Sequence, residues 1–168
     1  ADCGINILKI EGRGRSPEYV KTVTQCYKEA SIALDEKSYN EDKIVNLTNK
    51  LKTVYNRGFW GGYYLGKKMG EWAKSGGSQA TRKKEFIGKV ENFFSDISVA
   101  QVGIETGNLQ KNDEIIIIGK TTGVVEMKLP SVTVEGVDDV TAKKGDACTF
   151  KTDTLVRRGD QVYKFRTT

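Results

Sequence analysis

The spacing of apolar residues changes near residue 82, and this change constrains the fold more than any other feature of the sequence. Upstream, two sets of apolar side chains recur at helical spacing: Val20, Val23, Tyr27, Ala30 and Leu34, and then Ile44, Leu47, Leu51 and Val54. Downstream, the period is two and β-branched residues take over. Residues 74–79, Lys-Ser-Gly-Gly-Ser-Gln, have the composition of a flexible linker. We therefore expect an α+β chain with one part over residues 1–73 and a β-part over residues 82–168.

The β-part contains six short apolar runs, at residues 86–90, 99–104, 115–118, 132–134, 147–150 and 161–165. Short strands at this spacing indicate a small closed β-barrel, because closure removes exposed sheet edges. A Lys-Asn-Asp, a Lys-Gly-Asp and an Arg-Gly-Asp triplet end at Asp113, Asp146 and Asp160, each before a strand. Asn and Gly tolerate positive φ and Asp can bond the backbone that follows, so each triplet predicts a turn. The pattern resembles the barrel that forms the second domain of elongation factor Tu.

The N-terminal part begins with a strand-like run. Both faces of residues 5–10 are mostly apolar, as in a parallel strand covered on both sides. A basic glycine-rich turn follows, and then Ser16, Pro17 and Glu18 suit the start of a helix over residues 17–34. In such a βα unit, charged residues at the end of the strand commonly line a site. Lys9, Glu11 and Arg13 are therefore candidate catalytic residues; the alternative is that Lys9 and Glu11 neutralise each other while Arg13 faces water.

A second helix is expected to begin at Asn40, which suits an N-cap, and to end near Gly58. Residues 58–66 then interleave aromatic residues with glycines. With Arg57 beside them, Phe59 and Trp60 would form a surface on which a ligand or a nucleic-acid base stacks. The alternative is an irregular connector whose aromatic rings fill a gap between two domains.

The absence of histidine excludes several kinds of active site within this chain. Serine–histidine and cysteine–histidine nucleophile pairs and histidine zinc sites all need it. The three cysteines are far apart and form no CxxC pair, so we expect no metal site, no disulfide framework and a reducing, cytoplasmic location. No apolar run approaches the roughly 20 residues of a membrane helix. The net charge of +5 suits RNA or an acidic ligand, or alternatively a lysine-coated surface.

Two segments resemble signatures of peptidase family U32, the collagenase-like peptidases. Residues 9–13, Lys-Ile-Glu-Gly-Arg, with 16–20, Ser-Pro-Glu-Tyr-Val, form the first, and 56–59, Asn-Arg-Gly-Phe, with the Gly-Gly-Tyr-Tyr of 61–64, form the second. The resemblance implies that residues 5–10 and 17–34 are the last strand and helix of an eight-fold βα barrel. Lys9, Glu11 and Arg13 would then lie at the barrel mouth and bind an anionic group or shuttle a proton. Arg15, Tyr19, Arg57, Phe59 and Trp60 are the expected binding residues.

The resemblance also implies that the iron–sulfur cluster of some family members lies upstream, so we expect no cofactor in this chain. The first functional hypothesis is the C-terminal part of a collagenase-like peptidase, whose β-barrel binds a protein substrate or partner. The alternative is an RNA-binding module of an RNA-hydroxylation factor of the same family. In either case we expect no chemistry from this chain alone. It does not begin with Met, so we expect a cut piece whose unpaired strand at residues 5–10 forms a homodimer or packs on residues 59–64.

Overall fold

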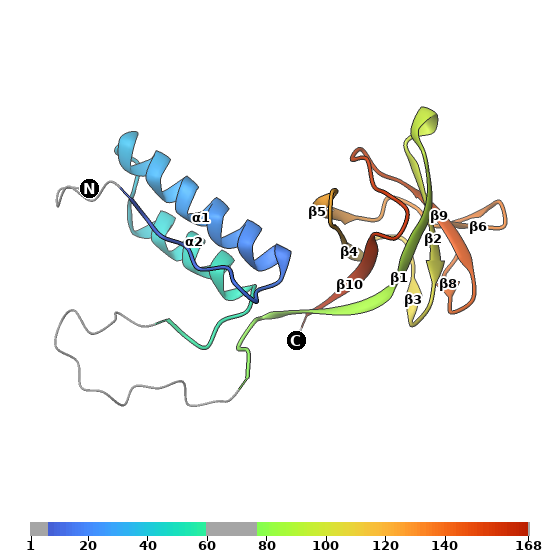
Figure 1. Ribbon diagram of the computed structural model, residues 1–168, viewed down its shortest axis with the longest axis horizontal. Helices are drawn as coiled ribbons and strands as arrows, with labels where there is room; N and C mark the ends of the chain where they lie inside the picture. The colour runs from blue at the N-terminus through green and yellow to red at the C-terminus, as the bar shows by residue number, and fades with distance from the viewer. Residues whose placement is uncertain (1–6, 60–76, 168) are drawn as a thin grey trace. The chain divides into compact units, whose positions relative to one another are not determined.

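The computed structural model describes residues 7–59 and 77–167 of the chain (Figure 1). Clustering of contacts divides the chain into two compact units, Ala1–Arg82 and Lys83–Thr168. The helices belong to unit 1 and almost the whole β-sheet belongs to unit 2. Each unit is described by itself below.

Unit 1 is built on two helices, α1 (Pro17–Asp35) and α2 (Glu41–Lys52), which pack together (Figure 1). The buried residues of the pair are Val23, Cys26 and Ala33 of α1 and Leu47 of α2. The set expected from helical spacing is only partly correct for α1, because Val20, Tyr27 and Leu34 are 38%, 44% and 42% exposed. An ion-pair network also joins the helices, because Glu29 of α1 accepts from Lys50 at 2.7 Å and Lys43 at 3.5 Å. Apolar burial and charge pairing therefore act on the same helix pair.

Both helices begin where the sequence predicts, but the second helix does not end where it was expected to. Pro17 occupies the first turn of α1, and Ser16 is its N-cap residue, although the Ser16 side chain makes no capping bond. Asn40 caps α2 by accepting a hydrogen bond from the Lys43 backbone at 2.9 Å. The helix ends at Lys52 and not near Gly58. The side-chain amide of Asn56 donates a hydrogen bond to the backbone carbonyl of Lys52. This carbonyl at the end of α2 therefore has a partner although the helix does not continue.

The expectation of a strand at residues 5–10 is wrong for residues 7–10, the part of this segment that the structure describes. Residues 7–12 have no regular secondary structure, and Ile7 and Leu8 are 86% and 60% exposed. A strand exists only as part of a hydrogen-bonded ladder, and no described residue pairs with this segment. The first residues of the expected strand lie outside the described range, as does most of the aromatic segment 59–64. A homodimer through this segment stays a prediction.

The described part of unit 2 contains ten strands, numbered in chain order, most of which are labelled in Figure 1. They are β1 (Arg82–Phe94), β2 (Val99–Ile104), β3 (Asn108–Leu109), β4 (Glu114–Gly119), β5 (Gly123–Lys128), β6 (Thr133–Val134), β7 (Val137–Asp138), β8 (Ala142–Lys143), β9 (Ala147–Lys151) and β10 (Gln161–Thr167). A 3₁₀ turn, Ser95–Ile97, separates β1 from β2. Each of the six expected apolar runs lies within or overlaps a strand, namely β1, β2, β4, β6, β9 or β10, but β5 was not expected. Strands β1 and β2 pair antiparallel.

The sheet is open, so the expectation of a closed barrel is wrong. Eight strands follow the order β5-β4-β10-β1-β2-β9-β6-β7, and β3 and β8 form a separate pair. Closure would need β5 to pair with β7. Instead the sheet ends in a short hairpin, in which β6 and β7 are two residues each and are joined by Glu135 and Gly136, which both have positive φ. The likeness to elongation factor Tu stays a prediction.

The core of unit 2 is one apolar cluster. Strand β2 shows the alternation that the sequence predicts, with Ala100, Val102 and Ile104 buried on one face. Ile115, Ile116 and Ile117 are all fully buried, so β4 is covered on both faces. Cys148 of β9 also lies in this cluster, where the sequence places it. Burial of apolar surface stabilises a fold by roughly 25 cal/mol per Å², and this cluster stabilises the sheet in that way.

The three Asp triplets form the same turn, which we call the triplet turn. Each Asp side chain accepts the backbone N–H three residues earlier, that of Gln110, Lys143 or Arg157, at 2.7–2.9 Å. The expectation that each Asp side chain bonds the backbone that follows it is therefore wrong, because the bond runs to the backbone that precedes it. The middle residues have positive φ, of 70° at Asn112, 98° at Gly145 and 90° at Gly159.

Each triplet turn is also fixed to the sheet by two backbone hydrogen bonds. The middle residue donates to, and the Asp carbonyl accepts from, one buried partner: Leu129, Ile104 or Val90. All six of these bonds measure 2.8–2.9 Å. One local motif thus anchors the chain at three places, and two of them, at Ile104 and Val90, lie on the paired strands β1 and β2.

Candidate functional site

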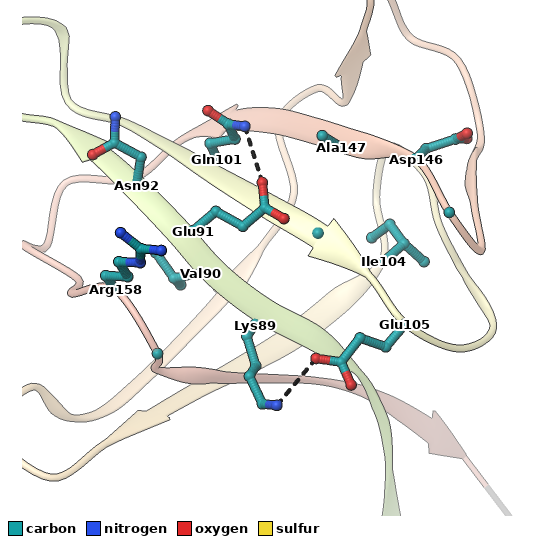
Figure 2. Close-up of a pocket in the computed structure, with 13 residues that line it drawn as sticks. Lys89, Val90, Glu91, Asn92, Gln101, Ile104, Glu105, Asp146, Ala147 and Arg158 are labelled. Atoms are coloured by element: carbon teal, nitrogen blue, oxygen red, sulfur yellow. Dashed lines mark hydrogen bonds and ion pairs between the residues drawn. The ribbon is translucent and has the colours of Figure 1, made fainter.

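An open hollow of about 830 Å³ lies on unit 2 where β1 and β2 pass between two triplet turns (Figure 2). Its charged lining consists of Lys89, Glu91, Glu105, Asp146 and Arg158. The first three come from the β1–β2 region, and Asp146 and Arg158 belong to triplet turns. Residues of two triplet turns, which are hydrogen-bonded to β1 and β2, therefore also line this hollow.

Two local irregularities shape the floor of the hollow. The register between β1 and β2 shifts between Val90 and Asn92, so Glu91 is the extra residue of a bulge. On β2, a Cβ at Gly103, the partner of Lys89, would collide with the Glu91 carboxylate. Glycine at position 103 therefore lets Glu91 lie across β2, where it accepts a hydrogen bond from Gln101 Nε2 at 3.0 Å (Figure 2).

The charges around the hollow are of both signs and only partly paired. Lys89 Nζ lies 3.2 Å from Glu105 Oε1, and both side chains are about half exposed (Figure 2). Arg158 has no ion-pair partner within the part of the chain that the structure describes. This surface can bind a polar chain that carries charges of both signs, and its free guanidinium suits a carboxylate.

The candidate catalytic residues at the N-terminus are all exposed. Lys9, Glu11 and Arg13 lie in the irregular segment before α1. The Glu11 carboxylate accepts the backbone N–H of Arg13 at 2.8 Å, so it supports the turn and does not pair with Lys9. The alternative of a Lys9–Glu11 ion pair therefore does not describe the geometry. The catalytic role of these residues stays a prediction.

The structure brings three of the expected binding residues together around one tyrosine. The Arg15 guanidinium lies 4.2 Å from the ring centroid of Tyr55 and 5.8 Å from that of Tyr19. Arg57 Nε donates to the Tyr55 phenol at 2.8 Å. This hydrogen bond, and then Arg15, hold the pKa of Tyr55 below its usual value.

The central residue of that group, Tyr55, was missed by sequence reasoning. Its position beside Arg57, next to the second family signature, was the available signal. Phe59 is exposed to 54%, and Trp60 lies outside the described residues.

Neither described cysteine is prepared for nucleophilic attack. Cys26 is buried between the helices, and burial raises the pKa of its thiol. Burial in the sheet raises the pKa of the Cys148 thiol to about 12. A thiol of this kind stays protonated near neutral pH and reacts slowly. Cys3 lies outside the described residues.

The described ranges contain neither a candidate metal site nor a candidate membrane-spanning helix. There, no three His, Cys, Asp or Glu side chains gather as metal ligands would. Likewise, neither of the two described helices combines the length and apolar character needed to span a bilayer.

This chain is similar to one family of peptidases and to known proteins that are named as a collagenase and a protease. The family model of peptidase family U32 matches residues 1–74. A "Collagenase" of Porphyromonas gingivalis is 45% identical over 164 residues, which cover 98% of this chain and 40% of that protein. An "Uncharacterized protease" of Methanocaldococcus jannaschii is 37% identical over 164 residues, 96% of this chain and 40% of that protein. This chain therefore spans about 40% of the length of these curated relatives.

A solved structure is similar to part of the chain. The C-terminal domain of a U32 peptidase from Geobacillus thermoleovorans aligns with a TM-score of 0.45 and 18% identity. The alignment covers 48% of this chain and 91% of that domain. The family expected from the two signatures, peptidase family U32, is confirmed: its family model matches residues 1–74, and the alignments with the sequence relatives cover nearly the whole chain.

Proposed function

We propose that this chain is the substrate-binding part of a collagenase-like peptidase, and that the hollow of unit 2 holds the polypeptide. The observation that carries the proposal is the open, two-signed hollow of about 830 Å³ on β1 and β2. Ligand sites are typically concave, of roughly 300–1,000 Å³, with a few placed polar groups. The relatives named as a collagenase and a protease make a polypeptide the expected ligand.

The charges of the hollow suit a polypeptide in particular. Glu91, Glu105 and Asp146 would attract basic side chains, and Arg158 an acidic one or a terminal carboxylate. Binding to RNA depends instead on an excess of cations facing phosphates. Residues 83–168, which make up unit 2, hold 13 Lys and Arg against 13 Asp and Glu, so unit 2 has no such excess. This balance favours a protein ligand over the RNA-binding alternative.

The same proposal assigns the cleavage step to residues outside this chain. The sequence has no histidine to act as a general base, and the two described cysteines are buried with raised thiol pKa values. A nucleophile needs a base within hydrogen-bond reach or a lowered pKa. These features support a binding role for the chain without peptide-bond chemistry of its own.

Fluorescence anisotropy of labelled gelatin with the purified chain tests the proposal. Arg158→Glu should weaken binding about tenfold or more, since it replaces the unpaired cation of the hollow by an anion. Lys151→Glu is the matched control, because it makes the same charge change on β9 outside the hollow lining and should leave binding within about twofold.

A labelled single-stranded RNA serves as the competing ligand in the same assay. The proposal is overturned if RNA binds with steep salt dependence while gelatin does not bind. Equal losses in Arg158→Glu and Lys151→Glu would also overturn it, because binding would then follow net charge and not the hollow.

A further inference from the structure

Unit 1 holds a second arrangement that the proposed function does not use. Arg15 stacks on one side of Tyr55 while Arg57 donates to its phenol, so two cations from separate segments meet at one ring. We propose that these three residues, the Tyr55 cluster, bind an oxyanion, which is a carboxylate or phosphate group of a ligand.

The position of Arg15 is fixed by the turn before α1. Its backbone N–H donates to the Gly12 carbonyl at 3.0 Å, and Gly14 has a φ of +68°, a conformation that glycine adopts without strain. The carboxylate of Glu11 binds the backbone of Arg13 in the same turn. That carboxylate is therefore used by the turn, and the Arg15 guanidinium is left to face Tyr55.

The position of Arg57 is fixed by Asn56. The Asn56 amide donates to the carbonyls of Lys52 and Val54, at 3.3 Å and 3.0 Å, and its side-chain oxygen accepts from Gly58 N at 3.1 Å. The neighbouring residues Tyr55 and Arg57 are thus held on a turn with few free torsions. Such preorganisation lowers the entropy lost when a ligand binds.

The cluster carries two positive charges that no carboxylate balances. Neither guanidinium has an ion-pair partner among the residues that the structure describes. Contact with an aromatic face attracts a cation only weakly at an exposed site and does not neutralise its charge. The lowered pKa of the Tyr55 phenol has the same origin, because the two arginines favour negative charge at this point.

The remaining donors of the cluster suit an oxyanion. Arg57 uses its Nε–H on the phenol, so both of its Nη groups stay available, and the side chain is exposed. A guanidinium has five N–H donors in a planar fork that matches carboxylate and phosphate oxygens. The Tyr55 hydroxyl can add one more donor. A purely structural clamp between the two turns would use the same contacts but would bind no anion.

Nuclear magnetic resonance of the chain labelled with ¹³Cζ-tyrosine separates the two roles. The Tyr55 resonance is assigned by its loss in Tyr55→Phe. Inorganic phosphate, acetate and chloride are then added separately at constant ionic strength near pH 7.5. We expect a saturable shift of this resonance with phosphate or acetate and none with chloride; the more strongly bound of the two identifies the source of the oxyanion.

Variants decide whether the cluster itself is the site. Arg57→Gln should weaken anion binding about tenfold, and Arg15→Gln by a similar factor, since each removes a charge-assisted bond. Lys28→Gln removes one positive charge from the exposed surface of α1; it is the matched control and should bind within about twofold of the original chain. Preserved amide spectra show that a variant is folded, and Arg57→Lys, which keeps the charge but loses the fork, should bind with intermediate affinity.

Three results would each overturn the inference. They are shifts that rise linearly without saturation, shifts of equal size with chloride, and undiminished binding by folded Arg57→Gln. Because these probes and residues belong to unit 1, failure here leaves the gelatin test of unit 2 unaffected.

Discussion

The triplet turns provide a matched pair of perturbations in one molecule. Asp160→Ala and Asp146→Ala remove the same side-chain acceptor, whose bonds to Arg157 N and Lys143 N measure 2.8 Å and 2.7 Å. The two sites differ in burial, because Asp160 is only 6% exposed whereas Asp146 is half-buried at the rim of the hollow. The comparison therefore isolates how burial changes the cost of losing one hydrogen bond.

The loss of unfolding free energy depends on whether water can bond the backbone N–H that loses its Asp acceptor. A hydrogen bond to a charged group contributes about 1.5–3 kcal/mol, and a donor left without water costs the upper part of that range. We expect Asp160→Ala to lower the free energy of unfolding by about 2–3 kcal/mol, because water reaches the Arg157 N–H poorly. Asp146→Ala should cost about 1 kcal/mol, since water can replace the lost carboxylate. Asp160→Asn keeps an acceptor and should lie between them.

Urea unfolding followed by the amide resonances of unit 2 measures these differences. With a dependence of about 1–2 kcal/mol per molar urea, Asp160→Ala should lower the midpoint by roughly 1–3 M. Amide exchange should rise locally at Arg157 in one variant and at Lys143 in the other. Equal losses in the two alanine variants, or a larger loss in Asp146→Ala, would refute the assignment of the cost to burial.

Three further predictions concern titrating groups. Cys148, whose thiol pKa burial raises to about 12, should react with a thiol reagent only after unfolding, and rapid labelling of the native chain would contradict its position in the core. Arg57→Gln should raise the pKa of Tyr55 towards the usual value, which ¹³Cζ titration measures, because the largest cause of the lowered pKa is removed. The hydrogen bond from Lys50 lowers the pKa of Glu29, so the pair stabilises unit 1 above pH 4.5 and the effect is lost as pH falls through the lower folded-state pKa. Helical circular dichroism of Glu29→Gln should therefore differ from that of the original chain near neutral pH and converge with it in acid.

Local features of the sequence were sufficient to predict the local structure. Pro17 and Asn40 mark helix starts because capping depends on a few adjacent residues. The Asp triplets mark turns for the same reason, since the bond in each spans only three residues. The alternation in β2 predicts its buried face because the side-chain period of a strand is fixed.

Features that depend on distant partners could not be predicted in this way. The strand expected at residues 5–10 needs a neighbouring strand, and closure of the sheet needs its two end strands, β5 and β7, to pair, which the sequence of neither strand shows. The hollow depends on the bulge at Glu91 meeting Gly103 of another strand. Tyr55 joins the candidate site only because Arg15, forty positions away, stacks on it.

Amide hydrogen exchange of the chain with and without excess gelatin tests the central claim most directly, that unit 2 binds a polypeptide in its hollow. The account predicts slower exchange at residues 89–92, 101–105, 144–147 and 158–159, which line the hollow or adjoin its lining, with the gelatin left intact after incubation. Arg158→Glu should abolish this protection and Lys151→Glu should retain it. Protection confined to α1 and α2, no protection at saturating gelatin, or cleavage of the gelatin by the chain would contradict the account.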